Sequence, residues 1–382
     1  MSQASVESIP SYWRRHGYPL ASETSFSMLA IKSILEERPY PIKGAVILWQ
    51  NLVAHIPCDR NVVNALKKLD FVLVMDTTWN ETTKYADVVL PTRFFFESDN
   101  ATVCQVSKSH VGQLALSRKA VDPPENVDAK SVSEIVYELV KRLFPEKAAK
   151  AEALLNPESV WREQCKLLEV DYRRLSEQGV ISTYDEPHYL PLGEAGVLPT
   201  ETGEIELINL RALETFSDYL SKPHNLNPLP TWIPPRWMEE GSELGEDEFV
   251  PVDYQHPLIA INTWTRDSPE LVGLLELGGD DGVFISRRRG SRVGLKGGDL
   301  VRLTADGGEL EVKVELSDLM RDEVVCGVHG LTPGLHEGGQ VRFEFMPRHG
   351  LNTNFLSDLV IVEGIGCAAL NDFRVRVRRL RS

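Results

Sequence analysis

Two short apolar segments constrain the fold most, because neither alternates as a half-exposed strand does. Residues 44–49 read GAVILW and residues 70–76 read DFVLVMD. Strands that are apolar throughout are typical of parallel sheets covered on both faces. Residues 59–69 between them have the apolar spacing of a helix, and we expect Asp59 to cap that helix. This succession predicts an α/β domain.

A third short strand is predicted over residues 86–90 (ADVVL), which follow a helical turn. Strand, helix, strand, turn and strand make a doubly wound, Rossmann-like α/β layout. Ligands of such sheets bind at the carboxyl ends of the strands. Asn51 and Asp76, at the ends of the first two strands, therefore lie on the expected ligand side.

The segments on either side of this domain read mainly as helices and turns. Apolar spacing predicts helices over residues 25–37, 131–144 and 147–178, after an irregular start over 1–24. Residues 202–208 (TGEIELI) read as a strand after a glycine turn. Residues 222–257 hold seven prolines and an acidic run, which indicates a surface linker.

The last 130 or so residues differ in character, because short strands follow one another with glycine-containing turns between them. Strands are predicted over residues 258–262, 283–285, 299–304, 309–315, 323–328, 342–345 and 373–377. This pattern is typical of a small β-barrel.

Composition excludes several classes of function. The chain has 41 Lys and Arg against 56 Asp and Glu, a net charge of −15, which argues against general nucleic-acid binding. No apolar run approaches the ~18–20 residues of a membrane span, and no secretory signal is seen. We therefore expect a cytoplasmic protein, or one exported only with a signal-bearing partner. The five cysteines include no CxxC pair, so neither a zinc nor an iron–sulfur site is expected.

Several longer motifs resemble those of one family. SILEERPYPIKGAVILWQNL, then VNALKKLDFVLVMDTTWNETTKYADVVLP with Glu97 following, and TETGEIELI occur before residue 210. LIAINTWTR, RVGLKGGDLVRLTADGGELEVKV, HGLNTNFLSD and NDFRVRV occur from residue 258 onward. Over about residues 30–382 the series resembles the C-terminal half of the molybdopterin oxidoreductases of the dimethyl-sulfoxide-reductase family. Within that family, the polysulfide, thiosulfate and arsenate reductases resemble this sequence most, although the resemblance is loose.

The resemblance implies a division into four parts: an N-terminal segment (1–40), part of the family's α/β domain (41–150), a helical region with the Pro-rich linker (151–254), and a dinucleotide-binding double-psi β-barrel (255–382). The family's iron–sulfur segment and metal-ligand domain have no counterpart in this sequence. The resemblance thus implies a bis-molybdopterin guanine dinucleotide, with molybdenum or tungsten, shared with a partner chain that supplies the missing N-terminal half. No iron–sulfur cluster is expected in this chain, and an iron–sulfur electron-transfer subunit is a further candidate partner.

In the α/β part, the resemblance implies three cofactor contacts. Asp76 matches an acid that contacts guanosine, although a strand-end Asp can also simply cap the next turn. Asn51 matches the Asn of a G-x-N-P loop, but Trp49 and Leu52 replace its Gly and Pro. Ser98 stands where some members have a lysine that contacts phosphate or ribose.

In the C-terminal part, the resemblance implies five more contacts. Thr263, Thr265 and Arg266 would meet a pterin and its phosphates, Asn354 a pterin edge, and Arg374 a phosphate. Hydroxyl and guanidinium groups donate hydrogen bonds to phosphate oxygens. An Asn amide can both donate to and accept from a pterin edge, which carries donors and acceptors.

Other polar residues are expected to be structural more often than functional. These are Asp87, the histidines His329 and His349, and a basic cluster formed by residues 287–289 with Arg292. For the cluster, a solvated face is weighed against phosphate or partner contact. No catalytic residue and no metal ligand is assigned.

Two functions stay open on the sequence. One is the cofactor-binding part of a split molybdenum or tungsten oxidoreductase, inactive alone, that serves oxo, sulfur or formate chemistry. The other is a cofactor-free structural or assembly subunit of a respiratory electron-transfer complex. The altered loop after Trp49 and the serine at 98 favour the second, whereas Asp76, Arg266 and Asn354 favour the first.

Overall fold

The computed structural model describes most of the chain, and its parts fall into two compact units. The first unit comprises Met1–Val74, Trp79–Val88 and Leu207–Ser382, and the second Met75–Thr78 and Val89–Glu206. The described residues are 7–18, 21, 26–100, 103–106, 113–182, 198, 200, 202–208, 229, 232, 234–238, 243–258, 265, 268–280, 282–331, 335–336, 339–340, 350–362 and 364–380.

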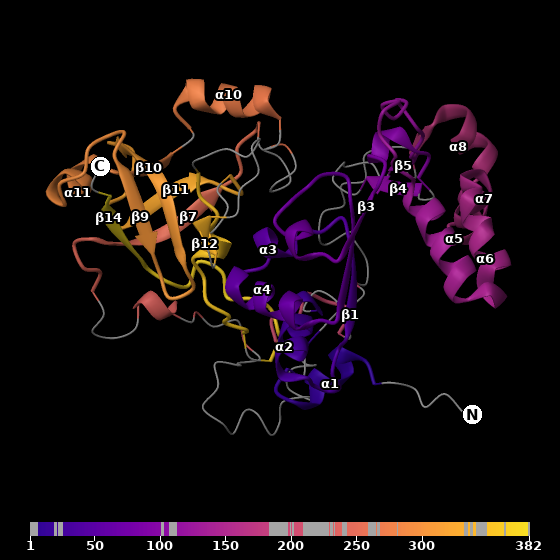
Figure 1. Cartoon of the computed structure of the whole chain (residues 1–382), viewed down its shortest axis with the longest axis horizontal. Coiled ribbons are helices and arrows are strands. Elements are labelled where there is room, and N and C mark those ends of the chain that lie inside the picture. The colour runs from indigo at the N-terminus through magenta and orange to yellow at the C-terminus, as the bar shows by residue number, and fades with distance from the viewer. Residues whose placement is uncertain are drawn as a thin grey trace. The chain divides into compact units, whose positions relative to one another are not determined.

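A three-stranded sheet in the order β1-β2-β3 carries the α/β part (Figure 1). Its elements are α1 (Ile9–Arg15), α2 (Phe26–Glu36), β1 (Gly44–Leu48), α3 (Leu52–His55), α4 (Asp59–Lys68), β2 (Phe71–Asp76) and β3 (Val88–Pro91). The predicted succession of strand, helix and strand is therefore present. Ile31, Ile47, Val62 and Val74 join its elements in one buried core.

The prediction that Asp59 caps the helix is wrong by one residue. The cap position belongs to Cys58, whose backbone is left-handed at φ 67°, and Asp59 is the first helical residue. Asp59 is buried, with 1% of its surface exposed. A carboxylate in the first turn still faces the positive end of the helix.

A closed six-stranded barrel forms the C-terminal part of the first unit, in the order β10-β8-β11-β7-β14-β9 (Figure 1, orange to yellow). Its strands are β7 (Glu248–Tyr254), β8 (Val283–Ser286), β9 (Leu300–Thr304), β10 (Glu309–Ser317), β11 (Val324–Val328) and β14 (Val375–Arg379). Leu310, Val312 and Val314 alternate inward on β10 and are fully buried. The small barrel expected from the sequence is thus confirmed.

Several local predictions in this region fail. Strand β7 lies inside the predicted linker. Its Pro251 argues against a strand in the sequence, yet that residue lies opposite Val325 in the parallel pairing of β7 with β11. Residues 202–208 form bends rather than a strand. The helices α10 (Pro269–Gly278) and α11 (Arg287–Arg292) and the short pair β12 (Leu335–His336) and β13 (Gly339–Gln340) were not anticipated. Most of the predicted strand 258–262, and all of 342–345, lie outside the described residues.

The second unit combines a sheet in the order β4-β5-β6 with four helices that lie together beside it (Figure 1). Its elements are β4 (Val103–Val106), β5 (Gln113–Leu116), α5 (Val132–Leu143), α6 (Ala148–Glu152), α7 (Pro157–Leu167), α8 (Tyr172–Gln178) and β6 (Val180–Ser182). Helix α5 begins at a capping box in which Ser131 and Glu134 each bond the other's backbone N–H. The helices predicted over 131–144 and 147–178 are present, the second divided into three.

None of the helices in the described part of the chain has the length and apolar character that crossing a bilayer requires.

Candidate functional site

A cavity of about 570 Å³ in the first unit brings together polar residues from three distant parts of the sequence. Gln50 and His55 come from the segment around α3, His329 follows β11, and Asn354 and Cys367 come from the last loops. We call this space the Asn354 cavity. Its volume lies in the range of small-molecule sites.

Asn354 is held rigidly at the wall of the cavity. It is 6% exposed, and its amide nitrogen donates to the backbone oxygens of Ala54 at 2.9 Å and His55 at 3.1 Å. Asn352 accepts from the Asn354 backbone and donates to Ala54 as well, at 3.0 Å. Both Asn354 N–H groups are therefore used to fix the loop, so the side chain can offer a ligand only its oxygen, as an acceptor.

His329 is oriented by a half-buried carboxylate, which the sequence did not reveal. Its Nδ1 lies 2.8 Å from Asp253 Oδ2, and the Thr353 hydroxyl donates to the same oxygen at 2.7 Å. Burial alone would raise the pKa of Asp253, but the hydrogen bonds from His329 and Thr353 outweigh it and lower that pKa. Because Asp253 is then a carboxylate, Nδ1 must donate, and Nε2 is the atom left for a ligand.

Asn51 lies in an internal network instead of standing free. Its amide nitrogen donates to Glu81 Oε2 at 2.6 Å, and its oxygen accepts from the Thr82 hydroxyl at 2.9 Å. All three residues are buried. The structure therefore gives Asn51 a role in joining the loop after β1 to the segment after β2.

The loop after β1 begins with a residue in the left-handed conformation. Trp49 has φ of 51°, the left-handed region that favours glycine, at the position where the resemblance has Gly. Its ring is 39% exposed and lines the Asn354 cavity. The indole thus adds an aromatic wall that a glycine would lack.

The two predicted contact residues of the second unit are both buried. Asp76 is 6% exposed, and its Oδ1 accepts from the Thr77 backbone at 2.7 Å, so the turn-capping alternative is realised for one oxygen. Ser98 is 8% exposed and lines a separate space of about 390 Å³ with Arg93 and Lys119. In the first unit, Asp87 accepts from the Val72 backbone at 2.7 Å, the structural role expected of it.

The remaining candidates are not gathered at the Asn354 cavity. Arg374 donates to Glu248 at 3.0 Å and lines a different groove on the barrel. Thr265 is described, and its backbone oxygen accepts from Ser268. Thr263, Arg266 and His349 lie outside the described residues.

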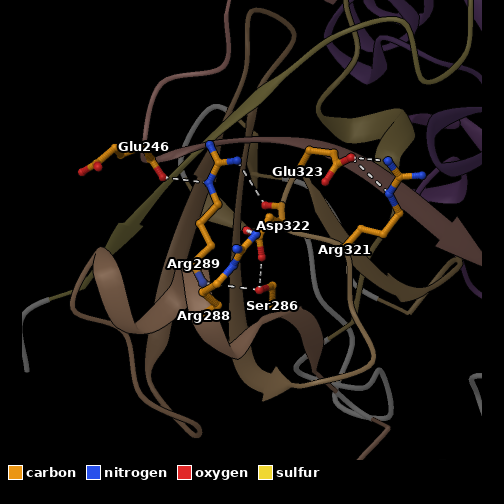
Figure 2. A network of polar contacts seen from close by, with 7 residues as sticks. All are labelled: Glu246, Ser286, Arg288, Arg289, Arg321, Asp322 and Glu323. Carbon is orange, nitrogen blue, oxygen red and sulfur yellow. Dashed lines mark hydrogen bonds and ion pairs between the residues drawn. The ribbon is translucent and has the colours of Figure 1, made fainter.

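The basic cluster at 287–289 is exposed but paired within the barrel (Figure 2). Arg288 binds Asp322, Arg289 donates to the backbone oxygens of Glu246 and Asp322, and the nearby Arg321 binds Glu323. These contacts support the solvated-face interpretation over phosphate binding. Within the described residues, no group of three His, Cys, Asp or Glu side chains could hold a metal ion.

Comparison with known proteins identifies the class. Residues 21–142 match the family model described as molybdopterin oxidoreductase. Relatives named trimethylamine-N-oxide reductase and dimethyl sulfoxide reductase match along most of the chain. These matches support a protein of the dimethyl-sulfoxide-reductase family of molybdopterin oxidoreductases, as the motifs predicted.

Individual relatives differ in how much they share. The F420-dependent formate dehydrogenase subunit alpha of Methanocaldococcus jannaschii is 38% identical over 98 residues, 26% of this chain and 14% of the relative. The trimethylamine-N-oxide reductase of Haemophilus influenzae is 24% identical over 331 residues, 79% of this chain and 36% of the relative. The acetylene hydratase from Pelobacter acetylenicus shares the fold, with a TM-score of 0.71 at 17% identity over 97% of this chain and 52% of that one. The chain thus spans about a third of the length of the curated relatives that it matches most extensively.

Proposed function

We propose that this chain is the cofactor-binding part of a molybdenum or tungsten oxidoreductase that carries bis-molybdopterin guanine dinucleotide. The Asn354 cavity carries the proposal, because the family's α/β segment and the barrel of this chain together enclose a space of ligand size with ordered polar groups. As part of the same proposal, the barrel has the double-psi topology and the sheet of the α/β part is doubly wound.

The groups at the Asn354 cavity fit one edge of a pterin. Such an edge carries amide-like donors and acceptors, and the cavity offers the Asn354 oxygen, His329 Nε2 and the Gln50 amide. Trp49 supplies an aromatic surface for a flat ring. When bound, the cofactor supplies two-electron redox chemistry at its metal, and the protein binds, orients and tunes it.

In the second unit, Asp76 is the proposed reader of the guanine. One of its oxygens is used by the Thr77 backbone, which fixes the carboxylate in place. The carboxylate can still accept from a guanine edge, because each carboxylate oxygen has more than one acceptor position. Ser98 is the proposed contact to a ribose or phosphate, and Thr263, Thr265, Arg266 and Arg374 to the phosphates.

We further propose that a partner chain supplies the missing N-terminal half and that the chain alone has no oxidoreductase activity. The matched relatives are about three times longer than the segment they share with this chain. The sheet of the first unit also leaves apolar side chains exposed on β1 and β2, with Val46 at 64% and Phe71 at 46%. Apolar groups clustered in this way mark an interface.

Cofactor analysis of the protein purified with its native partners tests the proposal. We expect guanine dinucleotide in the wild-type complex and less in Asp76→Ala, because losing a charge-assisted hydrogen bond lowers affinity by ~10- to 150-fold. Asp76→Asn keeps an acceptor for Thr77 but loses the charge, so an intermediate content is expected. Equal content in wild type and Asp76→Ala would refute the assignment of Asp76.

A structural subunit without cofactor is the second candidate, and one observation favours it. Asn51 and the N–H groups of Asn354 are used in internal hydrogen bonds. A subunit that only keeps the fold would need just these bonds. Complete absence of pterin and dinucleotide from the wild-type complex would decide for this candidate.

A further inference from the structure

The Asp253–His329 pair at the Asn354 cavity is built from three elements that lie far apart in the sequence. Asp253 lies in β7, His329 follows β11, and Thr353 begins the short helix η9 (Thr353–Phe355). The Asp253 carboxylate lies 2.8 Å from His329 Nδ1 and accepts from the Thr353 hydroxyl at 2.7 Å. One carboxylate therefore joins all three elements at the wall of the cavity.

The backbone holds His329 in place as well. Its N–H donates to the Tyr254 oxygen at 2.9 Å, and the residue forms a parallel bridge with Leu351. Leu351 is fully buried and Thr353 is 6% exposed, so the supports of the imidazole belong to the packed interior. The ring is thus fixed in one orientation, which proton transfer to or from a bound ligand requires.

Nε2 is the ring nitrogen that the cavity can use. Nδ1 bonds Asp253, His329 lines the cavity, and within the described part of the chain no group bonds Nε2. A carboxylate that accepts from Nδ1–H keeps the imidazole in the tautomer whose Nε2 can accept a proton, and it stabilises the imidazolium that then forms. The pair therefore has the arrangement of a general base.

The charge of Asp253 is directed at His329. In the described ranges its ion-pair partner is this histidine, and no lysine or arginine lies within salt-bridge distance of it. Burial and the charge of Asp253 raise the pKa of the Cys326 thiol on β11, so that thiol stays neutral. His55 and Cys367 are the other titratable side chains that line the cavity. The carboxylate thus remains available to stabilise an imidazolium.

We propose that His329 is the acid–base residue of the Asn354 cavity, that its Nε2 takes the proton from an ionisable ring N–H of a bound heterocycle, and that Asp253 and Thr353 position it. The Nε2–H bond forms as the N–H bond of the ligand breaks, and the electron pair of that bond stays on the heterocycle. Nδ1 keeps its proton, Asp253 stays a carboxylate, and nothing is oxidised or reduced in this step. The inference rests on the proposed function, because a pterin is the heterocycle proposed for this cavity.

Titration of the full chain with hydroxymethylpterin tests the proposal through two spectroscopic signals. Absorbance distinguishes the neutral from the anionic pterin, and NMR of nitrogen-labelled histidine reports the protons on the His329 ring. At a pH where the free pterin is neutral, we expect the bound pterin to be anionic and His329 to carry protons on both nitrogens. His329→Gln should leave the bound pterin neutral and weaken its binding about tenfold, the effect of losing a charge-assisted hydrogen bond.

Asp253→Asn tests the positioning role. The amide lacks the negative charge, and its NH₂ group can donate to Nδ1, so the proton of the free ring moves to Nε2. We expect the NMR signal to report this tautomer and the bound pterin to stay neutral, whereas a merely structural contact would change neither signal. Thr353→Val removes one donor to Asp253 and should reduce the anionic fraction of the bound pterin without abolishing it.

The matched control is His256→Gln. His256 also lies beside a carboxylate, Asp280 at 3.6 Å, but it does not line the Asn354 cavity. Its replacement should leave the bound pterin anionic. A neutral pterin bound to wild type, an anionic pterin bound to His329→Gln, or an equal effect of His256→Gln would overturn the proposal. A pterin that does not bind at all would overturn the proposed function as well, which distinguishes the two failures.

Discussion

Single polar residues in this chain hold loops in place even where the sequence marks them as ligand contacts. Asn51 joins two loops through Glu81 and Thr82, and Asn354 uses both amide hydrogens on the backbone of α3. The motifs of the sequence indicated that Asn51 and Asn354 are special positions. They could not indicate the hydrogen-bond partners of these residues, which lie 30 and 300 residues away in the sequence. The Asp253–His329 pair was missed for the same reason, because neither residue stands in a motif that names the other.

Trp49 gives a test at the residue scale. Its left-handed backbone disfavours most side chains by ~1–2 kcal/mol, and β-branched residues more than Asn. Trp49→Asn and Trp49→Val both lose the ring contacts, but only Val adds backbone strain. We expect the Val variant to be less stable than the Asn variant by ~1 kcal/mol in urea unfolding. Equal stabilities would show that the left-handed conformation is not retained.

Asp87 gives a second test at this scale. Its carboxylate accepts from the Val72 backbone at the start of β2. Asp87→Ala leaves that N–H without its partner, at a cost of ~1–3 kcal/mol in the free energy of unfolding. Asp87→Asn retains an acceptor and should cost less. A cofactor content that falls in Asp87→Ala without a loss of stability would instead favour a direct contact.

At the scale of elements, periodicity predicted β1, β2, α4, α5 and most of the barrel strands, because each buries one regular face. It failed at β7, where Pro251 and the acids before the strand resemble a linker. The carbonyls of β7 still pair with β11 and β14, and closure of the barrel decides the conformation there. Tertiary pairing of this kind cannot be read from a local window.

Helix α4 should give the chain a distinctive pH dependence. Burial raises the pKa of Asp59 to about 7 from a usual 3.8. Between about pH 4 and pH 7 the folded chain therefore holds a proton that the unfolded chain has released, and stability falls as pH rises, by up to ~1.4 kcal/mol per pH unit. Asp59→Asn should remove this slope, so its stability relative to wild type rises from pH 5 to pH 7. The exposed Asp70→Asn should leave the slope unchanged in the same urea series.

Two glycines test the packing of barrel elements. A Cβ on Gly307, in the turn between β9 and β10, would lie 1.8 Å from the backbone oxygen of Ser357, so Gly307→Ala must displace the loop that carries Asn354. Gly273 in α10 faces open space, and Gly273→Ala should stabilise by ~0.5–1 kcal/mol. We expect the first variant to lower the thermal midpoint and the second to raise it. A neutral Gly307→Ala would show that the turn and the loop are not packed as described.

At the scale of the whole molecule, the exposed apolar strand β1 is the feature that bears most on assembly. Val46 and Leu48 alternate with the buried Ile47, so one side of the strand packs on the core while the other meets solvent. The strand also lies at the edge of its sheet, where unpaired backbone groups can bind another strand. If a partner chain supplies the missing half, we expect it here, with an interface above ~2,000 Å².

Replacing this surface tests the partner directly. Val46→Thr combined with Phe71→Ser keeps the β1 strand and the start of β2 but makes the two most exposed apolar positions of these strands polar. Co-purification with the native partner should therefore be lost while the chain stays folded by circular dichroism. Leu277→Gln is the matched control, because that side chain is 87% exposed and belongs to α10, which is not an element of the sheet. Sedimentation of wild type should show association or aggregation at micromolar concentration, which the double variant reduces and the control does not. A stable wild-type monomer with no partner in native pull-downs would mean that the sheet tolerates this exposure, and the proposed partner chain would have to be abandoned.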